Sequence, residues 1–171
     1  REEPTEDPSE TWELPTEEPK GQMEYLDRVW DEDTQQVEEN LRTLDADQYT
    51  YLNDYSGYED LWNDLASGWY VVDRDISLKG RLIVRRGTVN LLLCDGCTLD
   101  APKGIGVEPG ATLHIYGQPQ GTGKIKSDGC AKYSAVIGGS YFGNEKDTLT
   151  QVLNAISGLD TGDIAIHGGT L

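Results

Sequence analysis

The chain has few of the residues that mark several common classes of protein. Its 171 residues include only 14 lysines and arginines against 31 aspartates and glutamates, and only three cysteines. A nucleic-acid-binding surface needs clustered lysine and arginine, so nucleic acid is not an expected partner. Three cysteines are too few for a scaffold built on disulfides. No apolar run approaches the length of a membrane span, so we expect no transmembrane segment in this chain.

The middle of the chain also lacks room for helices between its apolar segments. From Gly68 to Gln118, short β-branched or leucine-rich segments of strand length are separated by Gly, Pro or Asp. A parallel βαβ unit needs a crossover of a dozen or more residues, and none of the breaks is that long. The pattern predicts short strands at 70–72, 76–78, 82–84, 89–93, 105–107 and 113–116.

These segments recur at a regular spacing. Val89 and Leu113 are 24 positions apart, and Leu113 and Ile164 are 51 apart, close to two such steps. A repeat of this size with several short strands and glycine at the corners favours a solenoid of parallel strands in which Val89, Leu113 and Ile164 lie above one another. Alternation predicts that Asn90, His114 and Tyr116 point outward. It places these side chains inside: Val89, Leu91, Leu93, Leu99, Ile105, Val107, Leu113 and Ile115.

Glycine marks the expected corners, where a positive φ or a close backbone approach is needed. The positions are Gly110, Gly117, Gly121 and Gly123. Residues 135–139 read as a further strand and corner, and residues 163–171 as a last strand.

The acidic excess lies at the N-terminus. Residues 1–48 hold 17 acidic and 4 basic residues, whereas the remainder holds 14 and 10. Residues 1–20 combine Pro, Glu, Thr and Ser and have little to bury, which predicts disorder. We therefore divide the chain into an acidic, largely disordered leader over 1–50, with a loose helix near 23–26 and 37–44, and a β domain over 51–171. The start at Arg1 and the stop inside a strand suggest that both ends have been cut.

Two amphipathic helices are expected around the strands. Ser56 and Glu59 form a capping box before an apolar stripe that ends at Gly68, which predicts a capping helix over 56–67. Such a helix would cover the open edge of the first strands. Thr148 and Gln151 form a second capping box, which predicts an inserted helix over 147–157.

Four segments carry a pattern of strands and glycine corners: VNLLLCDG (89–96), GATLHIYGQPQGTGK (110–124), IGG (137–139) and GDIAIHGGT (162–170). Through these segments the chain from about Tyr58 onward resembles the right-handed parallel β-helix proteins of the pectate-lyase-like superfamily. It is similar in particular to secreted or wall-associated β-helix repeat proteins of gut-type Gram-positive bacteria. The resemblance implies an extracellular location, and many such proteins are surface or adhesin-like proteins.

Carboxylates are the first candidates for chemistry. The resemblance implies that related enzymes use acidic residues on adjacent turns of the β-helix. These residues serve as acid/base pairs or as Ca²⁺ ligands beside a basic residue. The candidates are Asp73, Asp75, Asp95 and Asp100, with Arg85, Arg86, Lys103, Lys124 and Lys126 near them in sequence. The alternative is that these aspartates hold turns, because Asp95-Gly96 has turn chemistry.

The cysteines and histidines are the remaining candidates. Cys94 and Cys97 form a C-x-x-C motif that suits a redox pair or half a zinc site, but the strand–turn–strand setting favours a structural role. That role is either a buried thiol or a disulfide, Cys94–Cys97 or Cys97–Cys130. His114 and His167 are expected to be surface histidines.

The aromatics near the expected cap helix are expected to fill the core beneath it, although they could also stack on sugar rings. They are Tyr51, Tyr55, Tyr58, Trp62, Trp69 and Tyr70.

These observations predict a non-enzymatic, extracellular surface or adhesion module that binds carbohydrate or a host protein and needs no cofactor. The alternative is a β-helix polysaccharide lyase or glycoside hydrolase, for which Ca²⁺ would be the expected ion. A purely structural spacer is a third possibility.

Overall fold

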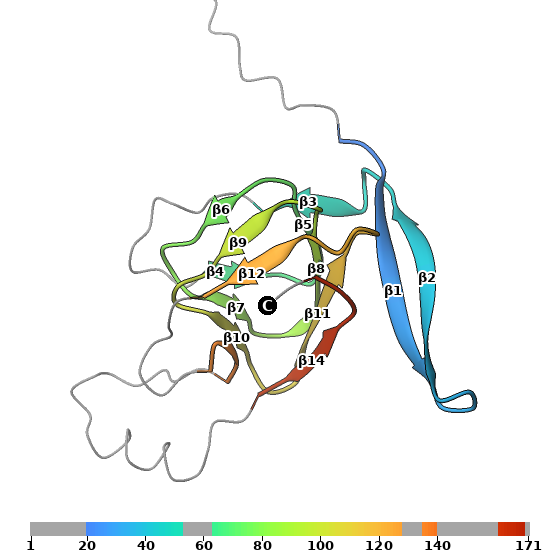
Figure 1. Ribbon diagram of the computed structural model, residues 1–171. Coiled ribbons are helices and arrows are strands. Elements are labelled where there is room, and N and C mark those ends of the chain that lie inside the picture. The colour runs from blue at the N-terminus through green and yellow to red at the C-terminus, as the bar shows by residue number, and fades with distance from the viewer. Residues whose placement is uncertain (1–19, 53–62, 128–134, 140–160, 170–171) are drawn as a thin grey trace, which may run out of the picture.

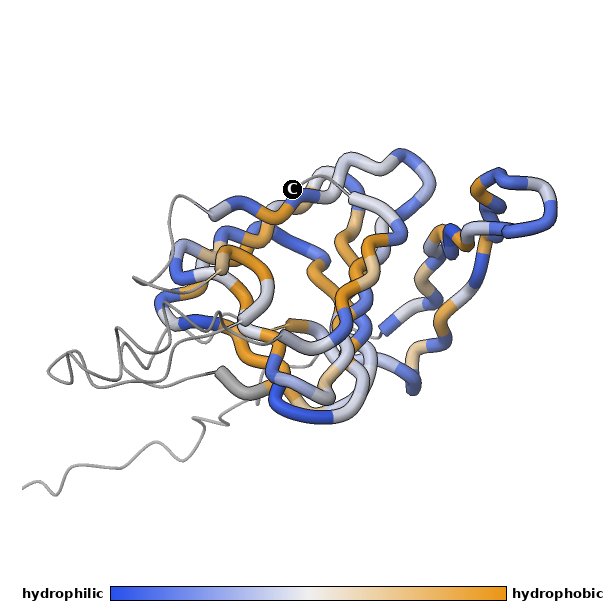
Figure 2. The backbone as a smooth tube through the Cα atoms, turned by 90° about the horizontal axis from the view of Figure 1, so that it is seen from below, coloured by the Kyte–Doolittle hydropathy of each residue, from blue (hydrophilic) through white to orange (hydrophobic). Residues whose placement is uncertain are grey.

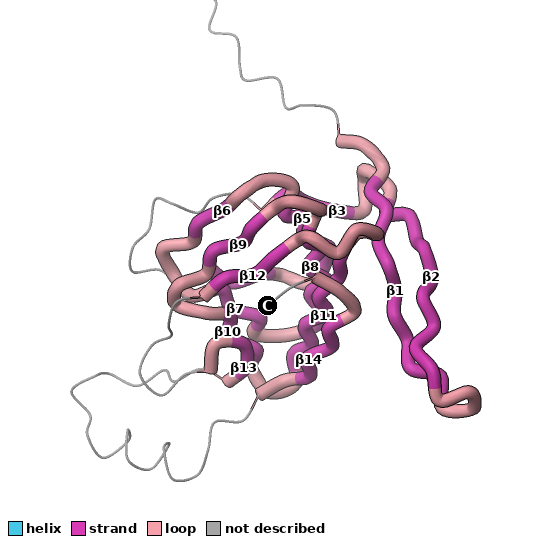
Figure 3. Tube along the Cα trace, in the orientation of Figure 1, coloured by secondary structure: helices cyan, strands magenta, loops and turns pink. Residues whose placement is uncertain are grey.

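The structure is a computed structural model that describes residues 20–52, 63–127, 135–139 and 161–169. The described residues form an all-β protein with parallel and mixed sheets, and none of them lies in a helix (Figure 3). Among these residues, therefore, none forms a helix that could cross a bilayer.

The largest sheet has seven strands in the order β2-β1-β11-β8-β5-β3, with β14 also paired to β11 (Figure 1). Its β3, β5, β8, β11 and β14 strands are parallel, and only β1 and β2 run antiparallel to their neighbours. The strands span Met23–Asp31 (β1), Gln36–Leu44 (β2), Tyr49–Tyr51 (β3), Gly68–Val72 (β5), Gly87–Leu93 (β8), Ala111–Gly117 (β11) and Asp163–Ile166 (β14).

Two smaller sheets are parallel throughout. One has the order β13-β10-β7-β4 and the other β12-β9-β6. From β5 to β13 the chain visits the seven-, three- and four-stranded sheets in turn, three times, and then returns to the first sheet at β14. The strands span Asn63–Leu65 (β4), Ile76–Ser77 (β6), Leu82–Val84 (β7), Thr98–Asp100 (β9), Ile105–Val107 (β10), Lys124–Lys126 (β12) and Ile137–Gly138 (β13).

The register expected from the sequence spacing is confirmed. Leu113 pairs in parallel with Val89 on one side and with Ile164 on the other. All six strands expected between positions 70 and 116 are present, and residues 137–138 add the expected strand beside β10.

The three sheets enclose one aliphatic core. Side chains alternate along a strand, so one set from each sheet points into the same interior. All eight side chains predicted to point inward are fully buried there, at 0% exposure. Burial of this kind is the main favourable term in folding, at about 25 cal/mol per Å² of apolar surface.

A second, smaller core lies on the outer side of the seven-stranded sheet. Tyr25 of the β1–β2 hairpin packs against Trp69 and Tyr116, with ring centroids 4.8 and 5.0 Å away. Leu92 and Cys94 are buried in the same cluster. Tyr116 therefore points away from the main core as predicted, but it is only 8% exposed because the hairpin covers it.

Glycine permits two of the turns for different reasons. Gly110 has a φ of +82°, in the left-handed region that favours glycine. Gly123 has an ordinary φ, but an added Cβ would lie 2.7 Å from the Cβ and the carbonyl oxygen of Leu93. Both positions were expected to be corners.

Several expectations from the sequence are wrong. Residues 23–26 and 37–44 belong to strands β1 and β2, not to a loose helix. Cross-strand pairs along the hairpin and the aromatic contacts to Trp69 stabilise these strands despite their irregular apolar spacing. The expected largely disordered leader therefore does not extend over residues 20–50. β3 also pairs with β5, so residues on both sides of position 50 share one sheet.

The expected helices have different outcomes. Residues 63–65, at the end of the expected helix over 56–67, form strand β4, which pairs with β7. Positions 56–62 of that expected helix fall outside the described residues. The inserted helix at 147–157 falls outside them entirely. The hairpin, rather than a helix, covers Trp69, and Tyr51 packs in the same outer cluster.

Candidate ligand-binding groove

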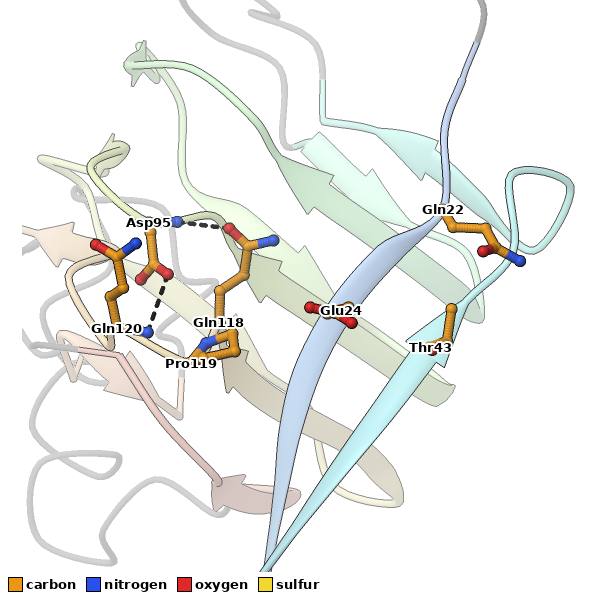
Figure 4. A pocket seen from close by; sticks show the side chains of 7 residues that line it. All are labelled: Gln22, Glu24, Thr43, Asp95, Gln118, Pro119 and Gln120. Carbon is orange, nitrogen blue, oxygen red and sulfur yellow. Dashed lines mark hydrogen bonds between the residues drawn. The ribbon is translucent and has the colours of Figure 1, made fainter.

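An open groove of about 620 Å³ lies between the hairpin and two loops of the main body (Figure 4). One loop follows β8 and the other follows β11. The hairpin supplies the opposite wall at the end nearest to Gln22. The lining residues are Gln22, Glu24, Thr43, Asp95, Gln118, Pro119 and Gln120.

Asp95 joins the two loops that form one wall. Its carboxylate accepts hydrogen bonds from the backbone N–H groups of Gln120 and Thr122, both at 3.0 Å. Its own N–H donates to the side-chain oxygen of Gln118 at 2.8 Å. Gly96 follows with a φ of +79°, and the Cys97 N–H closes the turn on the Cys94 carbonyl at 3.1 Å. Asp95 therefore has the turn-forming role expected of Asp-Gly, and it also shapes the groove.

The hairpin wall is fixed by its register. Glu24 pairs directly with Thr43, and directly opposed residues of antiparallel strands point to the same face. The Gln22 side-chain amide donates to Asp45 at 2.7 Å, which holds this end of the hairpin. The groove therefore has one wall of loop residues and one wall of strand residues.

The lining suits ligands rich in hydroxyl or amide groups. Glu24, Thr43 and the Gln120 side chain make no hydrogen bond within the described part of the chain, so their donors and acceptors face solvent. Glutamine offers both a donor and an acceptor, whereas an ionised carboxylate only accepts. The two carboxylates, Glu24 and Asp95, favour neutral or positively charged ligands over anions.

The other three candidate carboxylates lie outside the groove. Asp73 forms a two-point contact with Arg74, at 2.9 and 3.1 Å. Asp75 accepts the backbone N–H of Thr98 at 2.7 Å. The Asp73 contact is to the next residue, whereas the Asp75 contact joins segments 23 positions apart, and both carboxylates hold backbone or side-chain groups of the fold.

Asp100 has a different environment. Its Oδ2 lies 3.5 Å from the Ser77 hydroxyl across two paired strands, and its Oδ1 is buried without a hydrogen-bond partner. Asp100 is not brought into the groove with Asp95.

The basic candidates are also outside the groove. The Arg85 guanidinium pairs with Glu108 at 2.9 Å. None of the five basic side chains proposed as catalytic neighbours lines the groove: Arg85, Arg86, Lys103, Lys124 and Lys126. Within the described ranges there is no cluster of three or more histidine, cysteine or acidic residues able to hold a metal ion.

The C-x-x-C motif forms two free thiols. Cys94 is buried in the outer core, and burial raises its pKa to about 12. Burial also raises the pKa of Cys97. A redox or metal-binding cysteine needs a lowered pKa, so both shifts favour the structural interpretation. The pairing of Cys97 with Cys130 stays a prediction, because Cys130 lies outside the described residues.

The two histidines form a pair that the sequence did not indicate. His114 Nδ1 lies 3.0 Å from His167 Nε2, and His167 Nδ1 lies 2.8 Å from the Arg28 carbonyl oxygen. That carbonyl only accepts, so His167 donates from Nδ1 and, when neutral, accepts from His114 at Nε2. The expectation of simple surface histidines is wrong, because β1 of the hairpin lies against them. Burial, followed by the neighbouring His167, lowers the pKa of His114.

Arg81 was not singled out in the sequence, although it is the buried charged residue of the described core. Its guanidinium donates to the carbonyls of Lys103 at 2.6 Å and Ala135 at 2.8 Å, with longer contacts to three further carbonyls. The local sequence GRLIV did not indicate that Arg81 is buried, because the carbonyl groups that accept its hydrogen bonds are 22 to 58 positions away. Arg81 supports the fold and does not reach the groove.

No family model, curated protein or solved structure matches this chain. The assignment of a function to the groove therefore depends on its geometry and on the chemistry of its residues.

Proposed function

We propose that the described strands belong to a right-handed parallel β-helix of the kind the sequence resembles. The repeated visit to three parallel sheets in a constant order supports this proposal. So do the steps between paired residues, such as Leu82 to Ile105 and Val89 to Leu113. Right-handed crossovers are strongly preferred between parallel strands, which supports the hand.

We propose that the module binds carbohydrate in the groove without catalysing a reaction. The observation that carries this proposal is the convergence of three glutamines, a threonine and two carboxylates on one open groove. Sugars present many hydroxyl groups that both donate and accept, and side-chain amides and carboxylates are suitable partners for them. Because both charged lining groups are acidic, we expect neutral or amino sugars to be preferred over polyuronates.

The contacts of the candidate aspartates favour binding over catalysis. Hydrolysis of a glycosidic bond requires two carboxyl groups on either side of it, and the alternative implied by the resemblance is a set of Ca²⁺ ligands beside a basic residue. Asp95 uses its carboxylate to hold the Gln120 loop, and Asp73 and Asp75 are engaged elsewhere. A lyase or hydrolase is therefore the less favoured function for this part of the chain.

We also propose that the protein is secreted or attached to a cell surface. This location is supported by the resemblance to extracellular β-helix proteins. It fits a role in which a rigid stack of strands displays a groove to glycans outside the cell.

A glycan array followed by titration calorimetry tests the groove. We expect binding of neutral or amino-sugar glycans, and loss of binding in Gln120→Ala and Glu24→Gln. Gln36→Ala, at the other end of the hairpin, is the matched control and should bind normally. Incubation with polyuronates should yield no unsaturated product. Equal binding by the Gln120→Ala variant, or cleavage of any glycan, would refute the proposal.

A further inference from the structure

The β1–β2 hairpin has an apolar face that nothing in the described structure covers. Trp30, Val37 and Leu41 are 58%, 54% and 57% exposed. Trp30 pairs directly with Val37, and Leu26 pairs with Leu41, so all four side chains lie on one face. In Figure 2 the hairpin stands away from the main body and carries its own apolar segments.

The opposite face of the hairpin packs its apolar side chains on the body. Met23, Tyr25 and Leu44 pack in the outer core beside Trp69 and Tyr116. On the same face as Leu26 and Trp30, the Arg28 guanidinium also holds the hairpin, since it donates to the His167 carbonyl at 2.9 Å. The exposed apolar face therefore belongs to a hairpin that is fixed to the main body. Large exposed apolar patches on proteins mark interaction sites.

The outer edge of β2 is also free within the described structure. β2 stands at the end of the seven-stranded sheet and pairs only with β1. An unpaired strand edge offers a row of backbone N–H and C=O groups to another strand. β2 is nine residues long, which is enough to add a strand of ordinary length.

The charge of the hairpin limits what can dock there. Residues 23–44 contain seven acidic and two basic residues, and Glu38 and Glu39 lie in β2 itself. A second copy of this chain, with a net charge of −17, would be repelled. A basic partner would be attracted, and opposite charges on neighbouring strands stabilise their pairing.

We propose that the β2 edge and the Trp30–Val37–Leu41 face are a docking surface for an extended, lysine- or arginine-rich polypeptide that adds as a strand. Apolar side chains of this strand lie beside Val37 and Leu41, and a basic side chain on its other face lies beside Glu38, because side chains alternate along a strand. Backbone pairing supplies affinity, and the alternation of apolar and basic residues supplies specificity. The proposal does not rest on carbohydrate binding in the groove, although Thr43 of the groove lies two positions from Leu41 on the same face of β2.

The test uses two labelled nine-residue peptides, matched in length to β2. One alternates valine and lysine, and the other alternates valine and glutamate. We expect only the lysine peptide to bind, with affinity that falls as salt is added because the charges are exposed. Binding should slow amide hydrogen exchange at residues 36–44 selectively.

Variants locate the surface. The double substitution Val37→Thr and Leu41→Thr should weaken binding by about tenfold or more. The substitution Glu38→Gln should weaken it at low salt, and as an exposed surface change it keeps the test valid if the first variant misfolds. Val136→Thr is the matched control, because Val136 is an exposed apolar residue next to β13 at the end of the four-stranded sheet. This variant should bind the lysine peptide normally.

Four results would overturn the proposal. They are equal binding of the two peptides, no binding of either, unchanged affinity in both the double variant and Glu38→Gln, and self-association of the chain that the Val37→Thr and Leu41→Thr substitutions abolish. The last result would assign the surface to a second copy.

Discussion

Replacement of Arg81 by methionine tests how neighbouring strands of the four-stranded sheet are held together. Arg81 is 3% exposed, and its guanidinium donates to backbone carbonyls at Lys103, Ile105 and Ala135. One side chain therefore joins the start of β7 to the β10 region and to the segment before β13. Methionine keeps much of the apolar length of the side chain but provides no donor.

The expected loss follows from the two short contacts, at 2.6 and 2.8 Å. A hydrogen bond to a charged group contributes roughly 1.5–3 kcal/mol, so the two together account for about 3–6 kcal/mol. Removing a buried charge also relieves its desolvation cost, which offsets part of this loss. We expect the Arg81→Met variant to lose about 2–4 kcal/mol in its free energy of unfolding.

Urea unfolding followed by circular dichroism measures this change. Arg85→Met is the matched control: its guanidinium pairs with Glu108 at the surface, and such a pair contributes about 0–1 kcal/mol. Arg81→Lys keeps the charge but loses the planar fork, so it should fall between the two. If Arg81→Met unfolds within about 1 kcal/mol of the unsubstituted chain, the contacts do not stabilise the fold as argued.

Three further predictions follow from the same structure. Because burial raises the pKa of Cys94 to about 12 and also that of Cys97, both thiols should react with iodoacetamide at pH 8 much more slowly in the native state than in urea, as read by mass spectrometry. Because the pKa of His114 is lowered, protonation favours unfolding. Stability should be full above about pH 6.5 and fall as pH drops below that value, and His114→Gln should reduce this fall in thermal melts. Leu113→Ala, at a fully buried position, should cost about 2–5 kcal/mol in urea unfolding, whereas exposed Leu41→Ala should cost under about 0.5 kcal/mol; equal costs would contradict the assigned core.

The strands of the main body could be predicted because local signals were strong there. Val89, Leu91 and Leu93 alternate with outward side chains, and glycines interrupt the chain at the turns. Each signal lies within a few residues, so no knowledge of distant contacts was needed. The spacing between Val89 and Leu113 also indicated which strands pair.

The hairpin could not be predicted in the same way. Its apolar residues are interspersed with charges, and the aromatic contacts of Tyr25 with Trp69 and Tyr116 join segments more than forty positions apart in sequence. Its strands form because these distant rings provide a surface to pack on, and an isolated two-stranded hairpin is marginally stable at best.

The residues of the candidate site were likewise predictable only where the signal was local. Asp95 was identified from the sequence because Asp-Gly is a turn signal and a carboxylate is a possible ligand group. Its companions Glu24 and Gln120 were not, because the hairpin and the loop meet only in the folded chain. The pair His114 and His167 was missed for the same reason, with 53 positions between them.

By itself, the sequence determined the β class, the parallel register of Val89, Leu113 and Ile164, and the side chains that fill the main core. Periodicity and turn chemistry are local properties of the chain, so they can be read without a structure. Only the tertiary structure decided where the acidic hairpin lies, which carboxylate faces a groove and which apolar side chains stay exposed. Those outcomes depend on contacts between residues distant in sequence, and local sequence patterns do not specify such contacts.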